Sequence, residues 1–570
     1  MSVKENIYDD HNHIIVIFIL IWIQMSNYSV ENFTEEEKAK LRPYFTNLEG
    51  PVFALVNLPE VVKGALFARY SRSEKSLRRL FLDEFADGIE LDEGGKSEAD
   101  VGLERAEKLY KTVFSEYGDD SVAQLGGVHL ACEQVSNFLT KTLERSRLMS
   151  YLEQSTRYIP YDLPLSSGEY RYYRDPEILQ SEFSDRYLDD MNHVFDTYHD
   201  LLGKTISYLT AKYYPDADSL PTPPEKRALR ASALDLLRGL LPIGTISNMG
   251  IYGSGQAFEQ LLFKMMASDL PEAHSYAEMI KAELMKVIPS FLTRVDRQDR
   301  GGVWVKYLAD SRHNTEDIVK ETLLYDKISA GKDMPTSLLL TRLPKVELIS
   351  YDEEGEDKVL AAILFASTNL SHNDIKREII SIGNEKKDRI FQSYVGRRAN
   401  RRHKPGRAFE ADIYNFEIVS DYGTFRDLQR HRMLTIEWQQ PDPDLGIHMP
   451  EEIERAGLRD LYLESVNRSV DLYRLIYKQF PRQAIYSLPM ATNIRYKMEM
   501  NAREVLHLVE LRSTPQGHYN YRHIAQGIYR LIQEVAHHPH IAAAMQYTDF
   551  SQAQMGRLEA EERNSQKSLS

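Results

Sequence analysis

Two clusters of the form Arg-x-Arg are the groups in this sequence best suited to bind an anion. They are Arg145-Ser146-Arg147 and Arg430-His431-Arg432. Neighbouring cations repel one another, so an anionic or electron-rich partner is expected opposite each cluster. Seven residues separate the first cluster from Ser155, and Arg157 follows. Guanidinium groups with a hydroxyl suit a phosphomonoester, because arginine pairs with phosphate oxygens in a bidentate manner. A surface ion-pair network is the alternative for either cluster alone.

A third basic segment, "GRRANRRHKPGR", covers residues 396–407 and holds six Lys or Arg residues and one His. A solvated loop is the commonest origin of such a run. A loop that faces a phosphorylated cofactor or substrate is the functional alternative.

The composition is that of an ordinary globular protein and narrows the possible functions. The formal net charge of −15 argues against a nucleic-acid binder, which needs a basic face. The single cysteine, Cys132, excludes an intramolecular disulfide and a cysteine-rich metal site, and no metal is expected. Cys132 lies in an apolar stretch with a helical pattern, which predicts a buried structural thiol. A reducing, cytoplasmic setting fits this cysteine usage.

The N-terminus carries an apolar run, "IIVIFILIWI", at residues 14–23. Ten residues are too few to span a bilayer, and the acidic flank does not fit a signal peptide. Met25 begins a polar segment, so we interpret residues 1–24 as a mis-assigned start and expect no membrane partner.

The rest of the chain shows the same order of predicted elements twice. Residues 51–71 and 345–367 each predict a strand, a turn and an amphipathic helix. Each half continues with its Arg-x-Arg cluster and a long helical pattern, at 177–213 and at 450–479. A Leu-Pro step and two further helices close each half. The spacing differs between the halves, which excludes a fixed-period solenoid and favours a fused duplication about a pseudo-two-fold axis.

The predicted fold is therefore α+β, with two fused copies of a small antiparallel sheet flanked by long helices. The expected segments are an N-terminal extension (1–50), a first half (51–295), a linker (296–343), a second half (344–548) and a polar tail (549–570).

The pattern Arg-His-Arg, seven residues, then Ser with a later Arg-Tyr resembles the signature of the flavin-dependent thymidylate synthases. The block at 119–158, from "DDSVAQLGG" to "EQSTRY", is similar to the family's approach segment and signature. "YNFEIVSDYGTFRDLQRHR" (414–432) is similar to the same block, and "NAREVLHLVELR" (501–512) resembles the family's Asn-x-Arg and later Leu-Arg. The resemblance covers most of residues 51–545.

The two halves depart from the family signature in different places. In the second half, Gln440 and Asp442 replace the signature Ser and the later Arg, and in the first half Ser146 replaces the His. The family's Arg three residues before the Leu-Pro step is Arg238 in the first half and Ile485 in the second. Each copy has thus lost what the other keeps.

The resemblance implies one shared site with parts from both halves. The first half would supply a nucleotide-binding group, and the second half a flavin-binding group together with a catalytic arginine. The nucleotide-binding group is Glu153, Gln154, Ser155, Arg157 and Arg238, the flavin-binding group is Arg430, His431, Arg432, Asn501, Arg503 and His507, and the catalytic residue is Arg512.

The resemblance also implies the reaction. FAD reduced by NADPH, with methylenetetrahydrofolate as carbon donor, would methylate dUMP to dTMP. Arg512 matches the family residue that stabilises negative charge on the uracil ring, which removes the need for a cysteine nucleophile. A homodimer would form a pseudo-tetramer.

Two other functions remain open from the sequence. A flavoenzyme could act on another pyrimidine nucleotide, because Ser146, Gln440 and Asp442 depart from the signature. A non-catalytic nucleotide- or flavin-binding scaffold is the third possibility.

Overall fold

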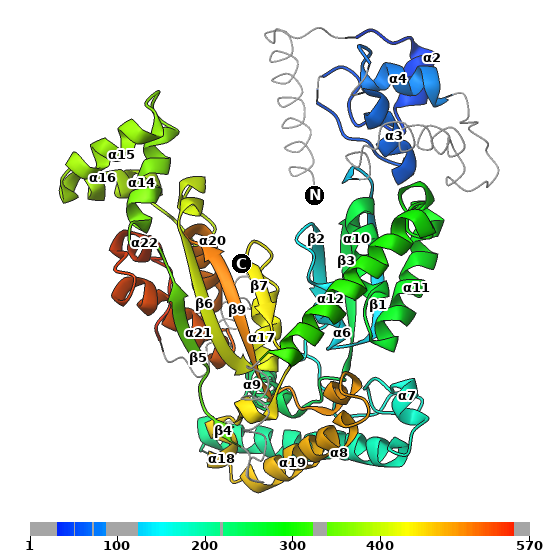
Figure 1. Ribbon diagram of the computed structural model, residues 1–570, viewed down its shortest axis with the longest axis vertical. Helices are drawn as coiled ribbons and strands as arrows, with labels where there is room; N and C mark the ends of the chain where they lie inside the picture. Colours follow the sequence, from blue (N-terminus) through cyan, green and yellow to red (C-terminus); the bar gives the residue numbers. More distant parts are fainter. Residues whose placement is uncertain are drawn as a thin grey trace, which may run out of the picture. The chain divides into compact units, whose positions relative to one another are not determined.

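The computed structural model describes residues 31–50, 52–70, 73–86, 124–216, 221–322 and 339–551 (Figure 1). The chain packs as two compact units. The first comprises Met1–Leu130, Tyr252–Ala267 and Tyr276–Ala309, and the second comprises Ala131–Ile251, Ser268–Ser275 and Asp310–Ser570. All the predicted site residues belong to the second unit. Among the described residues, none of the helices is long and apolar enough to cross a membrane, and the run at 14–23 and Met25 lie outside these residues.

The compact units divide the predicted first half between them, whereas the predicted second half lies wholly in the second unit. The boundaries of the halves therefore stay predictions. Within the expected linker, α12 (Val303–Glu321) is helical.

The first unit contains the short helices α2 (Glu35–Leu41), α3 (Glu60–Tyr70) and α4 (Leu77–Glu84). The strand expected before α3 is wrong, because the described residues there make only an isolated bridge between Leu55 and Phe45. Asn57 has a φ of 54°, which breaks the extended backbone that a strand requires.

A three-stranded sheet with the order β1-β3-β2 belongs to the first half. Its strands are β1 (Gly127–Ser136), β2 (Met149–Glu153) and β3 (Ile246–Ser254). Cys132 lies in β1, so the helix expected there is wrong. The buried thiol is confirmed, since Cys132 is 4% exposed, and burial raises its pKa to about 11.

A four-stranded antiparallel sheet with the order β5-β6-β9-β7 forms the centre of the second half. The strands are β5 (Lys345–Ser350), β6 (Ile413–Asp421), β7 (Thr435–Trp438) and β9 (Asn493–Asn501). Along β6 and β9 alternate residues are buried, and Phe416 pairs with Met498 and Ile418 with Tyr496. Helices α20 (Ala502–Arg512) and α21 (Tyr519–Glu534) pack on this sheet (Figure 1).

The long helical patterns are confirmed as α8 (Ser184–Tyr213) and α19 (Arg459–Tyr477), which pack against each other (Figure 1). The α+β class is therefore confirmed. The remaining described α-helices and strands are α6 (Leu139–Leu143), α7 (Pro176–Leu179), α9 (Pro223–Leu237), α10 (Gly255–Met266), α11 (Pro271–Val287), β4 (Leu340–Thr341), α14 (Gly355–Phe365), α15 (His372–Ser381), α16 (Asn384–Val395), α17 (Tyr422–Gln429), β8 (Ile447–His448), α18 (Glu451–Arg455) and α22 (Pro539–Ala544).

The two Leu-Pro steps lie antiparallel to each other, with Pro242 opposite Pro489. The amide of Ile243 donates to the carbonyl of Leu488 (2.7 Å), and the amide of Met490 donates to the carbonyl of Leu241 (2.8 Å). The residue numbers of the corresponding positions differ by 247 in each case. Equivalent bonds made in both directions are what a local two-fold axis produces, so the halves meet here about a pseudo-two-fold.

Candidate functional site

The outer arginine of each Arg-x-Arg cluster holds the strand that follows the other cluster. Arg147 Nη2 donates to the carbonyl of Leu434 (3.2 Å) and to Thr435 Oγ1 (3.0 Å). Arg432 donates to the carbonyl of Met149 and to the Ser150 hydroxyl. These contacts are pseudo-symmetric, and they give both outer arginines a structural role. Arg432, expected to bind flavin, makes its described contacts with β2.

The inner arginines differ between the clusters. Arg430, at the C-terminal end of α17, forms an ion pair with Glu153, whereas Arg145 pairs with Glu437 (2.7 Å) and lies 4.8 Å above the Trp438 ring. Arg145 thus combines a cation–π contact with an exposed ion pair, whereas Arg430 pairs with a buried carboxylate. Arg145 and Glu437 are largely exposed, while the Glu153 side chain is fully buried.

Glu153 is the hub of a buried charge cluster. It accepts from Arg426 Nη2 (2.6 Å) and lies 3.5 Å from Lys141 Nζ, and Lys141 also pairs with Glu144 (2.5 Å). Burial alone would raise the pKa of Glu153, but Arg426, Lys141 and Arg430 hold it well below its usual range. Because both carboxylate oxygens already have cationic partners, Glu153 positions Arg430 and does not present a free oxygen to a ligand.

Arginines from both halves surround a single carboxylate, Asp427 of α17. Arg238 Nη1 lies 2.8 Å from Asp427 Oδ2, and Arg512 donates to the Asp427 backbone carbonyl. Burial would raise the pKa of Asp427, but Arg238, Arg430, Arg157 and Arg512 together hold it far below its ordinary value. Asp427 is not among the site residues predicted from the sequence. Its position three residues before Arg430, on the same helix face, is the signal that could have found it.

Arg238 retains unused donors inside the protein. The residue is 3% exposed, and its Nε and Nη2 groups have no hydrogen-bond partner among the described residues. A buried N–H without a partner costs free energy, so a ligand oxygen opposite these groups would stabilise the protein.

The other members of the predicted nucleotide-binding group are more fully engaged. Arg157 makes a bidentate pair with Asp235 (2.8 and 2.9 Å) and donates to the Tyr521 hydroxyl (2.7 Å). Ser155 Oγ accepts from the Arg157 amide (3.2 Å). Gln154 is half-buried, and its described contacts are made by its backbone.

A cavity of about 820 Å³ is lined by Asp235 and by Gln516, whose carbonyl also accepts from Arg157. None of the predicted site residues lines this cavity.

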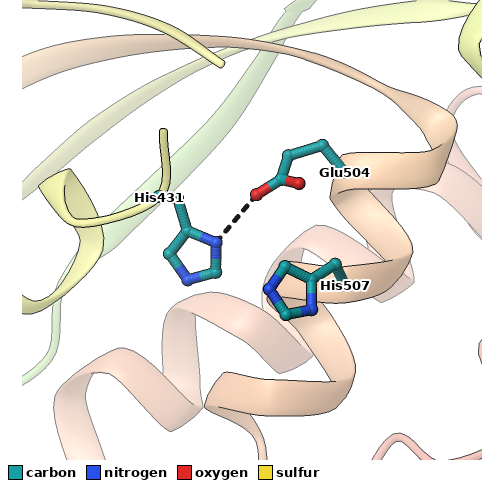
Figure 2. Close-up of side chains that lie close together, drawn as sticks. All are labelled: His431, Glu504 and His507. Atoms are coloured by element: carbon teal, nitrogen blue, oxygen red, sulfur yellow. Dashed lines mark hydrogen bonds and ion pairs between the residues drawn. The ribbon is translucent and has the colours of Figure 1, made fainter. Parts of the chain in front are cut away.

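In the second half, His431 connects Arg512 to Glu504, and Figure 2 shows the contact between His431 and Glu504. Arg512 Nε donates to His431 Nε2 (3.0 Å), so the imidazole proton must be on Nδ1, which lies 2.9 Å from Glu504 Oε1. Burial and the Arg512 charge hold the pKa of His431 well below its usual range, and burial raises that of Glu504. The imidazole is therefore neutral, and both its nitrogens are already in use.

His507 lies beside this pair, with its ring centroid 5.3 Å from that of His431 (Figure 2). Burial lowers the pKa of His507 to about 4. Potential ligand atoms of His431, Glu504 and His507 lie within 4.8 Å of one another, which is close enough for a metal ion. A metal on Nδ1 of His431 would require the remaining proton on Nε2, where Arg512 already donates, so the hydrogen bonds oppose metal binding.

Asn501 and Arg503 lie at the start of α20. Asn501 is the N-cap residue, and its Oδ1 accepts from the Glu504 amide (2.9 Å), which leaves its amide nitrogen for a ligand. Arg503 Nε donates to the carbonyl of Pro405 (2.9 Å), which ties α20 to the basic segment 396–407.

The geometry thus brings together Arg157 and Arg238 of the first half with Arg430 and Arg512 of the second, around Asp427. Comparison with known proteins identifies the family of this chain. A model described as "Thymidylate synthase complementing protein" matches residues 65–290 and 347–539.

Relatives align along nearly the whole chain. A UPF0159 protein of Chlamydia muridarum is 37% identical over 540 residues, covering 93% of this chain and 98% of its own length. The UPF0159 protein Ta1429 of Thermoplasma acidophilum is 32% identical over 539 residues, covering 89% and 99%. Among solved structures, a UMP/dUMP methylase, PolB from Streptomyces cacaoi bound with 5-Br dUMP, aligns with 37% of this chain and 98% of its own, at 15% identity and a TM-score of 0.30. The family model matches more than half of the chain, one segment falling in each predicted half, and the chain accordingly belongs to the thymidylate synthase complementing protein family, with two such segments in tandem.

Proposed function

We propose that this protein is an FAD-dependent thymidylate synthase that converts dUMP to dTMP with methylenetetrahydrofolate and NADPH. The family assignment supports a thymidylate synthase-like activity, and the specific nucleotide, cofactor and cosubstrates are the proposal. The observation that carries it is the convergence of four arginines, two from each half, on Asp427.

The unused donors of this arrangement suit a phosphomonoester. The positive charges of Arg157, Arg238, Arg430 and Arg512 lie near Asp427, with Asp235 beside Arg157 and Glu153 beside Arg430. Asp421 also acts on Arg238. Arg238 nevertheless keeps unused N–H groups that could bind the oxygens of a nucleotide phosphate.

Arg512 fits the role of stabilising charge on the pyrimidine. Its Nε and one Nη2 proton are committed to His431 and Asp427, and within the described ranges Nη1 has no partner. A guanidinium fixed in this way by two neighbours is preorganised to stabilise the negative charge that develops when uracil loses its N3 proton.

The predicted flavin-binding group fits FAD in its donor chemistry. His507 offers a neutral imidazole, Asn501 an unused amide, and Lys404 and Arg503 positive charge nearby. When bound, reduced FAD would supply hydride, while these residues hold and orient the cofactor. A homodimer and a cytoplasmic location complete the proposal.

Growth and spectroscopy test the proposal together. The purified protein should show flavin absorbance and oxidise NADPH only when dUMP and methylenetetrahydrofolate are present. The gene should also restore growth of a thymidine-requiring bacterial strain without thymidine, while a gene carrying Arg512→Ala should not. Bound FAD without rescue would favour a flavoenzyme acting on another pyrimidine nucleotide, and a protein without FAD would favour a non-catalytic scaffold.

A further inference from the structure

The basic segment 396–407 presents four cations that form no ion pair within the described residues. Arg397, Arg401, Arg402 and Lys404 are exposed, and none of their side chains makes a hydrogen bond or ion pair within the described ranges. A solvated loop is the common explanation of such a run. Four adjacent cations without a paired carboxylate are, however, also available to an external anion.

The segment has a fixed shape, because another of its cations, Arg398, is buried and fixes the backbone. Arg398 is 5% exposed and makes a bidentate pair with Glu510 (2.6 Å for both bonds). It also donates to the carbonyl of Ala544 (2.6 Å), and the Tyr547 hydroxyl donates to the Arg398 carbonyl (2.6 Å). A buried, fully bonded ion pair holds the backbone in one conformation, so the remaining cations are presented on a rigid support.

Three of these cations face a common pocket. A hollow of about 270 Å³ is lined by Arg401, Arg402, Lys404, His507, Glu510 and Leu511. Glu510, the only carboxylate of this lining, is already neutralised by Arg398. Burial, with the charges of Arg503 and Arg398, lowers the pKa of Lys404 despite Glu504 and Glu510 nearby. The pocket is therefore an electropositive site.

We propose that this pocket binds the diphosphate of a dinucleotide. Arginine forks and a lysine are the preferred ligands of phosphate oxygens. The volume is below that of a typical whole-ligand pocket, so it suits one anionic group of a larger molecule that continues outside. His507 lines this pocket and also belongs to the predicted flavin-binding group, so FAD is the first candidate and NADPH the second. The choice of FAD rests on the proposed function, whereas the diphosphate site does not.

The test compares two variants that each lose three positive charges. The first is Arg401→Gln, Arg402→Gln, Lys404→Gln. The control is Lys376→Gln, Lys386→Gln, Arg389→Gln, which removes exposed cations from α15 and α16. Equilibrium dialysis of the full-length proteins with FAD, FMN and NADPH, at 50 and 200 mM salt, gives the affinities. FMN lacks the diphosphate and therefore separates this site from the flavin-ring contacts.

The pocket variant should bind FAD, NADPH or both about tenfold more weakly at low salt, with a smaller salt dependence, while FMN binding and the control variant should match the unmodified protein. A loss of affinity for FAD alone, or for NADPH alone, identifies which dinucleotide supplies the diphosphate. Equal affinities in the two variants, or equal losses of affinity for FMN and FAD, would overturn the proposal. If the unmodified protein binds NADPH through this pocket but no FAD, the diphosphate site stands and the proposed FAD-dependent function fails.

Discussion

Asp427→Asn is the substitution that most directly tests the arginine-rich site. The change keeps the size of the side chain but removes the negative charge shared by Arg238 and its three arginine neighbours. Asp427 lies 2.8 Å from Arg238, and 15% of its side chain is exposed. Two unit charges at this distance attract each other by about 6 kcal/mol at an effective dielectric constant near 20. Removing one partner of a buried pair costs about 3–5 kcal/mol. Because Asp427 is partly exposed, we expect a loss of about 3 kcal/mol in the free energy of unfolding.

A phosphomonoester should reverse much of that loss. Saturating dUMP at a hundred times its Kd would stabilise the unmodified protein by about 2.7 kcal/mol. In the variant the arginines carry one more uncompensated charge, so dUMP should bind about tenfold more tightly and the stabilisation should grow by about 1.4 kcal/mol. Urea unfolding with and without dUMP measures both effects.

Asp190→Asn provides the matched control. Asp190 is fully buried on α8 and pairs with Arg468 and Arg186, and none of the three belongs to the predicted site. This variant should also lose stability but should gain no additional stabilisation from dUMP. The reasoning is refuted if Asp427→Asn unfolds like the unmodified protein, or if dUMP stabilises the two variants equally.

The same carboxylate gives a pH signature. Its pKa in the folded protein is below the ordinary value of 3.8, so its contribution to stability is present above that value and is lost as the pH falls further. Unfolding measured between pH 5 and pH 3 should therefore show a steeper acid loss for the unmodified protein than for Asp427→Asn.

Three further changes test other parts of the site and fold. Arg512→Ala should lower dUMP-dependent NADPH oxidation by at least about a hundredfold while FAD stays bound, and unchanged turnover would contradict its assigned role. Cys132→Ser should leave turnover within about twofold, because a buried thiol with a pKa of about 11 is no nucleophile at neutral pH, and a dead enzyme would count against chemistry without a cysteine. His540 lies between Glu356 and Asp388, which raise its pKa to about 9, so its contribution to stability is complete below about pH 6.5 and is lost as the pH rises through 9. Urea unfolding of His540→Gln at pH 6 and pH 10 should lack this loss, and an equal loss in the variant would assign it to another group.

The sequence predicts the elements well where a periodic pattern is long. Helices α8, α19, α20 and α21 follow from apolar residues at helical spacing, and β5 with α14 follows from the strand-turn-helix pattern. Short apolar runs do not distinguish the residue spacing of a helix from that of a strand. The stretch around Cys132 reads as helical but forms β1, since its burial depends on neighbouring strands that the pattern does not reveal.

The sequence finds the candidate site through residue type and spacing, but it does not reveal which groups neutralise one another. Glu153 was expected to contact the nucleotide, yet Arg426 and Arg430 already use its oxygens. Both ring nitrogens of His431 are likewise in use. The only sequence signal for Asp427 is its spacing to Arg430, because Arg157, Arg238 and Arg512 are distant from it in the sequence. Charge pairing of this kind depends on the tertiary fold.

The pseudo-two-fold explains why both halves have an Arg-x-Arg cluster although only the first has the serine and arginine that are predicted to bind phosphate. Arg147 and Arg432 each hold the strand that follows the other cluster, so loss of either would remove side-chain hydrogen bonds that join the two halves. The inner positions lack this constraint, and there the halves have diverged: Arg430 faces a buried carboxylate, whereas Arg145 lies on Trp438 at the surface. The structural contacts therefore account for the symmetry of the outer arginines, and the inner arginines differ because they do not share these contacts.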